Sequence, residues 1–298
     1  MGNMPPVTKN LLIINVLFFA GSYASSLYGV DLEDMLGLHF LLASDFHVYQ
    51  LFTYMFMHHN FYHLFFNMFA VWMFGRIMEA TMGQRRFILF YLLCGIGAGL
   101  TQEVAQYAHY LYAGLGEFGQ VNTGYQIVGM SDYLNAWTTV GASGCVYGVL
   151  LSFGMAYPEE RMFIIPIPVP IKAKYFVVGY AVIELLYALL GPSDGVAHVA
   201  HLGGMLFGLL LILYWRRSDR NRGNGGCSFD GIKRWLSGLG RRGGNRFMVE
   251  RGGKFGQEME YNQRKKMEED ELDRILDKVR KHGYGSLTEE EKRRIFRH

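Results

Sequence analysis

The sequence predicts an all-α membrane protein, a polytopic bundle of six transmembrane helices. Half of the 298 residues are hydrophobic and only 18% are charged. Lys and Arg are absent from three long stretches, residues 10–75, 87–160 and 175–215. A soluble fold of this length would need charge over its whole surface, so these stretches indicate helices that face lipid and exclude a soluble single domain.

Six apolar stretches approach or reach the ~20 residues that a helix needs to cross a bilayer. They are residues 10–29, 62–82, 87–112, 142–158, 173–190 and 197–215. No small-x-small cleavage pattern follows the first, so we expect a retained span rather than a signal peptide. Its connection to the second span, residues 30–61, is too long for a tight turn and too apolar for free solution. We expect this connection to lie half-sunk in one leaflet.

Basic residues fall on alternate connections between the predicted spans. The groups are Lys9; Arg76, Arg85 and Arg86; Arg161, Lys172 and Lys174; and Arg216 with Arg217. Basic connections stay on the cytoplasmic side of a membrane. We therefore expect a multi-pass protein of the cell membrane whose N-terminus and C-terminal tail are both cytoplasmic. The opposite connections carry no basic residue, which supports the even number of spans.

Composition divides the chain into three parts, of which residues 1–217 form the membrane domain. Residues 1–215 carry a net charge of −5 and the remainder +8. Residues 218–257 contain eleven glycines among many basic residues, which is typical of a flexible tether and leaves contact with anionic lipid as a second interpretation. Residues 258–298 predict a small cytoplasmic helical hairpin, in which Thr288 and Glu291 form a capping box.

Polar and ionisable side chains gather at three span ends, where they are functional candidates because they are costly in a membrane. The first group is His58, His59, His63 and Asn67; the second is the segment GASGCVYG, Gly141 to Gly148, with Ser143 and Tyr147; the third is HVAHLGG with His198 and His201. All three ends lie opposite the basic connections. The groups can therefore meet without any helix bending.

Glycines at small-xxx-small spacing explain how two of these groups come close. Gly144 and Gly148 form one pair, and Gly204 and Gly208 form another. Such pairs let helix backbones approach nearly to contact. Ser143 immediately precedes the first pair, so the spacing predicts that the fourth and sixth spans touch beside it.

Nucleophilic catalysis needs a hydroxyl, a base that takes its proton, and donors for the oxyanion. Ser143 and His201 supply the first two. The Ser143 N–H, the Asn67 amide and His63 are suitable donors, because a helix N-terminus presents free N–H groups. Tyr147, one turn below Ser143, is expected to pack against the imidazole. The acids nearest in sequence, Glu184 in mid-span and Asp194 in a connection, suit no third role, so we expect a dyad.

Each feature also has a less specific interpretation. A glycine-flanked serine in a membrane helix is commonly a packing residue, and histidines there are often structural. The histidines could instead bind a metal, but no HExxH motif or carboxylate accompanies them, and Cys94, Cys145 and Cys227 have no metal-binding spacing. We expect neither metal nor cofactor. The segment GASGC also departs from the G-x-S-x-G of soluble α/β-hydrolases.

At these residues the sequence resembles the rhomboid family of intramembrane serine proteases. The resemblance rests on FMHHNFYHLFFNM, GRIME, GASG followed by Tyr147, and AHLGGMLFG, in this order over about residues 8–217. It implies that Ser143 is the nucleophile and His201 the general base, that His63 and Asn67 line the oxyanion site, and that Tyr147 stacks on the base. It also implies a membrane-embedded first loop, a short fourth span that keeps Ser143 below the membrane surface in a water-filled cavity, and a tail like that of some bacterial rhomboids.

Two positions depart from the family pattern. Tyr49-Gln50 stands where rhomboids often have an aromatic residue followed by arginine, and the sixth span has two histidines. The fixed offset to Gly204 favours His201 as the base, which leaves His198 one turn nearer the aqueous side, where it would bind water or shape the entrance.

The expected function is cleavage of transmembrane segments of membrane proteins within the lipid bilayer, with no nucleic acid partner. One rival is a catalytically silent rhomboid-like membrane chaperone or adaptor. Another is a small transporter that uses histidines as a proton relay.

Overall fold

The computed structural model describes residues 4–164, 167–190, 195–221 and Thr288. The chain forms two compact units, Met1–Arg241 and Arg242–His298, and apart from Thr288 the described residues belong to the first. The predicted linker and helical hairpin therefore lie almost wholly outside the described residues. The linker's first residues, up to Asn221, continue the last helix.

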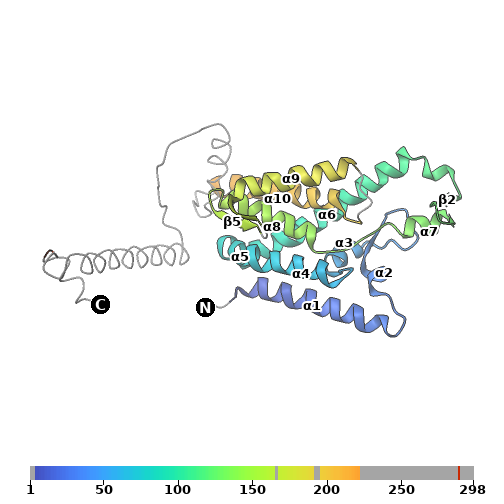
Figure 1. Cartoon of the computed structure of the whole chain (residues 1–298), viewed down its shortest axis with the longest axis horizontal. Coiled ribbons are helices and arrows are strands. Elements are labelled where there is room, and N and C mark those ends of the chain that lie inside the picture. Colours follow the sequence, from blue (N-terminus) through green and yellow to red (C-terminus); the bar gives the residue numbers. More distant parts are fainter. Residues whose placement is uncertain (1–3, 165–166, 191–194, 222–287, 289–298) are drawn as a thin grey trace. The chain divides into compact units, whose positions relative to one another are not determined.

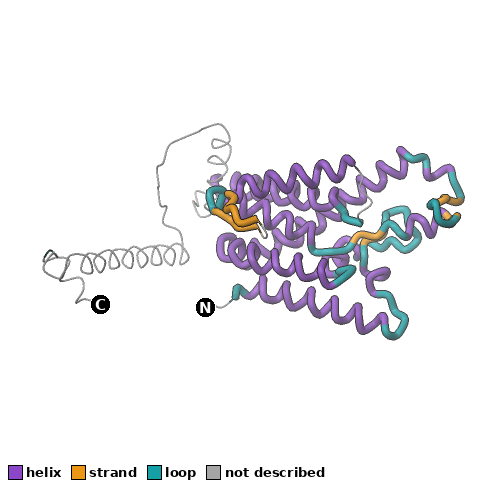
Figure 2. Tube along the Cα trace, in the orientation of Figure 1, coloured by secondary structure: helices purple, strands orange, loops and turns teal. Residues whose placement is uncertain are grey.

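The first unit is mainly helical, and its helices follow the predicted spans in order (Figures 1 and 2). They are α1 (Pro6–Ser26), the run α4 (Phe61–Ala70), η2 (Val71–Gly75) and α5 (Arg76–Met82), then α6 (Gln84–Tyr112), α8 (Ser143–Ala156), α9 (Ala173–Leu190) and α10 (His198–Asn221). Among the described residues, four helices are long and apolar enough to cross a membrane, namely α1, α6, α9 and α10. Helix α8 has 14 residues, about 21 Å at 1.5 Å per residue.

The connections contain short helices and strands that the sequence did not predict. Between α1 and α4 lie α2 (Leu32–Leu36), β1 (Leu38–His39), α3 (Gln50–Thr53) and η1 (Tyr54–Phe56); between α6 and α8 lie η3 (Leu115–Glu117), β2 (Gln120–Asn122), β3 (Ile127–Gly129), α7 (Met130–Asn135) and β4 (Thr138–Thr139); between α8 and α9 lie β5 (Arg161–Ile164) and β6 (Ile167–Lys172). The strands pair antiparallel as β1 with β4, β2 with β3 and β5 with β6. The all-α class therefore describes the bundle, and these pairs satisfy backbone groups in its connections.

Helices α6, α8 and α10 pack closely, and the backbones of α8 and α10 have almost no space between them. A Cβ added to Gly204 would lie 2.0 Å from the Gly144 carbonyl oxygen, and one added to Gly148 would lie 2.5 Å from Cys94 Sγ on α6. Gly208 likewise faces Gly148, whose Cα would be 3.3 Å from an added Cβ. The two glycine pairs thus meet face to face, as their spacing predicts.

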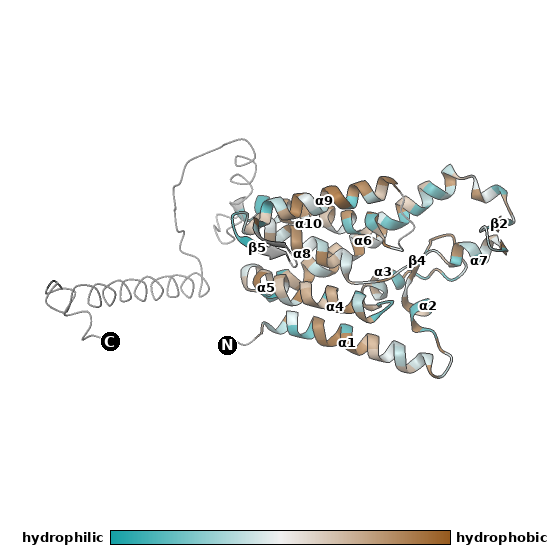
Figure 3. Ribbon diagram, in the orientation of Figure 1, coloured by the Kyte–Doolittle hydropathy of each residue, from teal (hydrophilic) through white to brown (hydrophobic). Residues whose placement is uncertain are grey.

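Charged contacts join helix ends at one side of the bundle, the side of α5, β5 and the N-terminus in Figure 1. The Glu79 carboxylate accepts hydrogen bonds from the Thr8 N–H at 2.7 Å and its hydroxyl at 2.8 Å. Arg86 and Asp219 form a bidentate ion pair between α6 and α10. Away from these contacts the outer faces of the helices are apolar (Figure 3), and Leu17 on α1 and Leu190 on α9 are largely exposed. Such faces suit a lipid environment.

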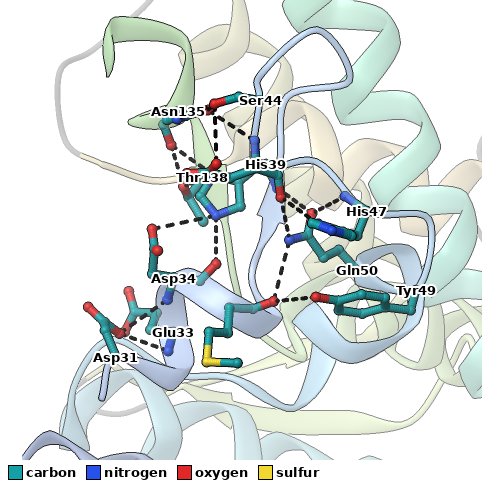
Figure 4. Close-up of polar contacts among 12 residues, drawn as sticks. Asp31, Glu33, Asp34, His39, Ser44, His47, Tyr49, Gln50, Asn135 and Thr138 are labelled. Carbon is teal, nitrogen blue, oxygen red and sulfur yellow. Dashed lines mark hydrogen bonds and ion pairs between the residues drawn. The ribbon is translucent and has the colours of Figure 1, made fainter. Parts of the chain in front are cut away.

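Gln50 anchors the first loop (Figure 4). Its side chain is buried, its Oε1 accepts from the His47 N–H at 3.0 Å and the His39 N–H at 3.4 Å, and its Nε2 donates to the carbonyls of Asp45 at 2.9 Å and Met35 at 3.4 Å. An amide can both donate and accept, so Gln50 bonds backbone groups of both kinds. The loop is therefore held although the family's usual arginine is missing.

His39 ties this loop to the connection before α8 (Figure 4). Its Nδ1 lies 2.8 Å from the Asn135 carbonyl oxygen and 3.1 Å from Thr138 Oγ1, and its Nε2 lies 2.6 Å from the Asp34 carbonyl oxygen. Since β1 also pairs with β4, the segment that leads into Ser143 is fixed from two directions.

Replacing Gln50 with methionine is expected to destabilise the protein by roughly 1–3 kcal/mol, because buried backbone groups would lose their partners. Tyr49→Phe is the control, since it removes a single hydrogen bond, from an exposed hydroxyl to the Met35 carbonyl. Thermal unfolding of both variants in detergent measures the difference. A Gln50→Met protein as stable as the wild type would show that the amide does not anchor the loop.

Candidate active site

Ser143 is the first residue of α8, and the chain just before it has an unusual backbone conformation. Gly141 has φ of +125°, a region that other residues rarely adopt. Its N–H donates to the Tyr54 carbonyl at 2.9 Å. The turn at Gly141 brings the chain abruptly from β4 into the helix, so the Ser143 side chain lies beside the N-terminal N–H groups of α8.

His201, on the first turn of α10, contacts this serine directly. Its Nε2 lies 2.8 Å from Ser143 Oγ. The Tyr147 ring stacks on the imidazole with 4.2 Å between ring centroids and 9° between planes. The pairing of serine and histidine, and the stacking of Tyr147, have the geometry that the sequence predicts.

His63 lies on the other side of the serine. A Cβ added to Gly141 would be 2.7 Å from His63 Nε2 and 3.7 Å from Ser143 Oγ, so the imidazole packs on the bare face of the glycine next to the hydroxyl. Asn67 is buried one turn further along α4, and its Nδ2 donates to the His63 carbonyl at 2.9 Å. This hydrogen bond holds the Asn67 amide against its own helix.

A carboxylate lies beside the serine and histidine, although no third acid was evident in the sequence, which favoured a dyad. Glu184 Oε2 lies 2.9 Å from His201 Nδ1, and the Tyr147 hydroxyl donates to Oε1 of the same carboxylate. Glu184 is buried on α9, and two turns before it on the same face Val177 packs against Gly154 of α8. The sequence shows that Glu184 is in mid-span, but not which face of α9 meets α8 and α10.

His198, which the sequence suggests is one turn nearer the aqueous side than His201, also contacts the carboxylate. It is buried, and its Nδ1 lies 2.7 Å from Glu184 Oε2. One helical turn separates it from His201, so both imidazoles reach the same oxygen. Glu184, His198 and His201 offer donor atoms within 4.8 Å of one another. The fold therefore places a carboxylate next to these histidines, although no sequence motif pairs it with them.

The remaining histidines of the first group line an outer cavity of about 470 Å³ between the end of α1 and α2. Burial lowers the pKa of His58 to about 3, so this imidazole is neutral. His59 forms an ion pair with Glu33, whose hydrogen bond raises the pKa of His59 above its ordinary value. Within the described part of the chain, neither imidazole forms a hydrogen bond with Ser143.

The His59–Glu33 pair makes the order of α2 dependent on pH. A raised pKa means that the contact stabilises the loop below the ordinary histidine value and that this contribution is lost as pH rises through the raised one. We expect hydrogen-exchange protection factors of α2 to fall as pH rises above the ordinary histidine pKa of about 6.5. Glu33→Gln should flatten this profile, and Glu117→Gln, in the exposed turn η3, should not. An unchanged profile in Glu33→Gln would contradict the assignment.

Sequence models of two families match the chain. The Rhomboid domain matches residues 45–218, which is more than half of the chain and includes Ser143 and His201. A family of unknown function (DUF6576) matches residues 258–298. The second match falls on the C-terminal segment, which apart from Thr288 lies outside the described residues.

Curated proteins are similar over part of the membrane domain. Rhomboid protease AarA of Providencia stuartii is 28% identical over 160 residues, 53% of this chain and 52% of its own length. Rhomboid protein 1, mitochondrial, of Saccharomyces cerevisiae is 28% identical over 162 residues, 52% and 38% of the two chains. Presenilin-associated rhomboid-like protein, mitochondrial, of Rattus norvegicus is 28% identical over 160 residues, 53% and 36%. The chain thus matches about a third to a half of each relative's length.

Proposed function

Because this chain belongs to the rhomboid family, we propose that it is a serine endopeptidase that cleaves transmembrane segments, with Ser143 as nucleophile and His201 as general base. The observation that carries the proposal is the 2.8 Å contact between Ser143 Oγ and His201 Nε2. A hydroxyl within hydrogen-bond reach of an imidazole nitrogen is what activation of a nucleophile requires.

The proposed reaction has two stages. Ser143 Oγ attacks the carbonyl carbon of the scissile bond while its proton passes to His201 Nε2, and a tetrahedral oxyanion forms. That proton then moves to the leaving nitrogen, the C–N bond breaks, and an acyl ester remains on Ser143. Water attacks the ester, His201 takes its proton and returns it to Ser143 Oγ, and the carboxylic acid product leaves.

Donors around Ser143 suit the oxyanion. The first N–H groups of α8 have no partner within their helix, and a helix N-terminus favours negative charge. His63, which packs on Gly141, and Asn67, one turn further along the same helix, are proposed as further donors. Each preorganised donor of this kind contributes about 10²–10³-fold to the rate.

We further propose six membrane spans. The run from Phe61 to Met82 counts as one span that the turn η2 interrupts, and α8 counts as a short one. The basic side of the bundle is assigned to the cytoplasm, together with both termini, and the membrane is taken to be the cell membrane. Because α8 begins inside the layer and reaches only the cytoplasmic side, Ser143 lies below the opposite surface in a water-filled cavity.

Substrates and partners follow from this position. A substrate helix must unwind locally at Ser143, because its peptide bonds are otherwise shielded and hydrogen-bonded, so small or helix-weak residues are expected at the scissile bond. The lipid bilayer surrounds the membrane domain. The basic linker is proposed to contact anionic lipid. The silent chaperone or adaptor is less well supported, since it does not need a serine and a histidine in contact.

Reconstitution with a single-span reporter protein tests the proposed activity. Mass spectrometry of the products is expected to find new termini at one peptide bond within or next to the reporter's transmembrane segment. Recovery of intact reporter, bound to the protein but uncut, would support the adaptor and contradict the protease.

A further inference from the structure

We propose that Glu184 is a positioning residue that holds His201 in the tautomer able to accept the Ser143 proton, so that the site works as a serine–histidine–glutamate relay. The inference rests on the proposed protease function. It adds to that function a third side chain, from α9, which neither the motifs nor the spacing of the sequence indicates.

Glu184 accepts hydrogen bonds from three side chains on two other helices. Its Oε2 faces His201 Nδ1 at 2.9 Å and His198 Nδ1 at 2.7 Å, both on α10, and its Oε1 accepts from the Tyr147 hydroxyl on α8. The carboxylate is buried, with 5% of the residue exposed. Three donors converging on a buried carboxylate suit its ionised form, since a protonated carboxyl would itself have to donate.

This arrangement selects one tautomer of His201. With an ionised acceptor at Nδ1, the proton of the neutral imidazole lies on Nδ1, and Nε2 presents its lone pair to the Ser143 hydroxyl 2.8 Å away. That is the form a general base requires. The opposite tautomer would remove the His201 donor from the Glu184 carboxylate and place a proton on the nitrogen that has to accept one.

The contact also gains strength during the reaction. When Ser143 gives up its proton, His201 becomes an imidazolium next to the carboxylate, and the pair changes from a buried single charge to an ion pair. In an apolar site such a pair is stabilised more strongly than in water. An interaction that strengthens in the transition state raises kcat rather than substrate affinity.

Two imidazoles and a carboxylate are also a possible set of zinc ligands. A tetrahedral ion bound at about 2.1 Å would hold its ligand atoms about 3.4 Å apart. The nitrogen-to-oxygen distances of 2.7 Å and 2.9 Å are hydrogen-bond lengths instead. Tyr147 moreover occupies the second carboxylate oxygen. The geometry therefore favours the hydrogen-bonded relay.

Glu184→Gln tests the proposal, because the amide can donate to Nδ1 and so favours the wrong tautomer. We expect kcat to fall by about 10²–10⁴-fold with KM changed by less than about threefold. Glu184→Asp, which keeps the charge, should recover part of the loss. Glu103→Gln is the matched control, since Glu103 is another buried glutamate and accepts from the Leu41 N–H at 2.7 Å, outside the site.

Several outcomes would overturn the relay. The first is a kcat of Glu184→Gln within about threefold of the wild-type value. The second is an equal loss of kcat in Glu184→Asp and Glu184→Gln at unchanged thermal stability. The third is wild-type activity that a chelator abolishes and added zinc restores. If Glu184→Gln proves unstable, the comparison of Glu184→Asp with wild type decides alone: a reduced kcat at unchanged KM supports the relay, and unchanged kinetics contradict it.

A second readout separates failure of the relay from failure of the proposed function. If wild type cleaves no faster than Ser143→Ala, the protease proposal fails. Nitrogen-15 NMR of labelled histidine at about pH 8 still reports the His201 tautomer, assigned by its loss in His201→Gln. The relay predicts a proton on Nδ1 in wild type and on Nε2 in Glu184→Gln. The same tautomer in both proteins would contradict it.

Discussion

Cleavage of a reconstituted transmembrane substrate is expected to fall at least about 10³-fold when Ser143 or His201 is replaced by alanine. Without the hydroxyl there is no nucleophile, and without the imidazole nothing takes its proton at the 2.8 Å contact. Initial rates of product formation in proteoliposomes measure the loss. Because the two side chains act as a unit, the double variant should be no slower than either single one.

Matched variants separate loss of chemistry from loss of fold. Ser152→Ala lies on the same helix, where the Ser152 hydroxyl donates to the Val149 carbonyl, and it should leave the rate nearly unchanged. His198→Ala should cost far less than His201→Ala, because His201 Nε2 lies 2.8 Å from Ser143 Oγ whereas His198 Nδ1 contacts the Glu184 carboxylate. Equal losses in the two histidine variants would contradict the choice of base.

Gly204→Ala is expected to have the second largest effect. Its Cβ would lie 2.0 Å from the carbonyl oxygen and 2.7 Å from the carbonyl carbon of Gly144. Both are backbone atoms, so relief requires α10 to move away from α8. Overpacking of this kind costs about 1–3 kcal/mol or more. A displacement of about 1 Å between reacting groups lowers a rate about 10²-fold, so His201 should lose most of its ability to activate Ser143.

Unfolding temperature and cleavage rate of Gly204→Ala should therefore both fall. Gly179→Ala is the control, because Gly179 on α9 has no atom within 4 Å of an added Cβ, and alanine there should be neutral or slightly stabilising. Full activity and stability in Gly204→Ala would mean that the two helices do not touch as closely as described.

The sequence predicted the features that depend on local pattern. Charge-free stretches located the helices, and the offsets within GASGCVYG and AHLGG predicted that Ser143, Tyr147 and His201 meet, because glycines at four-residue spacing act through helix geometry alone. The described helices begin or end within a few residues of the predicted spans, except that α10 continues to Asn221. That all six cross the membrane is a proposal.

What the sequence did not predict depends on how elements turn toward one another. Glu184 was visible only as an acid in mid-span, since hydropathy gives the length of α9 but not its rotation about its own axis. Its spacing of seven places it on the same face of α9 as Val177, but only the structure, in which Val177 packs on Gly154, shows that this face meets α8. The contact of His198 with Glu184 was not predicted for the same reason, because its partner comes from α9. The loop anchors Gln50 and His39 bond groups whose positions depend on how the connections fold, which no motif records.

Labelling with a fluorophosphonate, which reacts with activated serines, tests the central claim most directly. We expect a covalent adduct that peptide mapping assigns to Ser143. Wild type and Ser152→Ala should form it, Ser143→Ala should not, and His201→Ala should form it far more slowly. No adduct on folded wild-type protein, or equal labelling of wild type and His201→Ala, would contradict the claim that His201 activates Ser143.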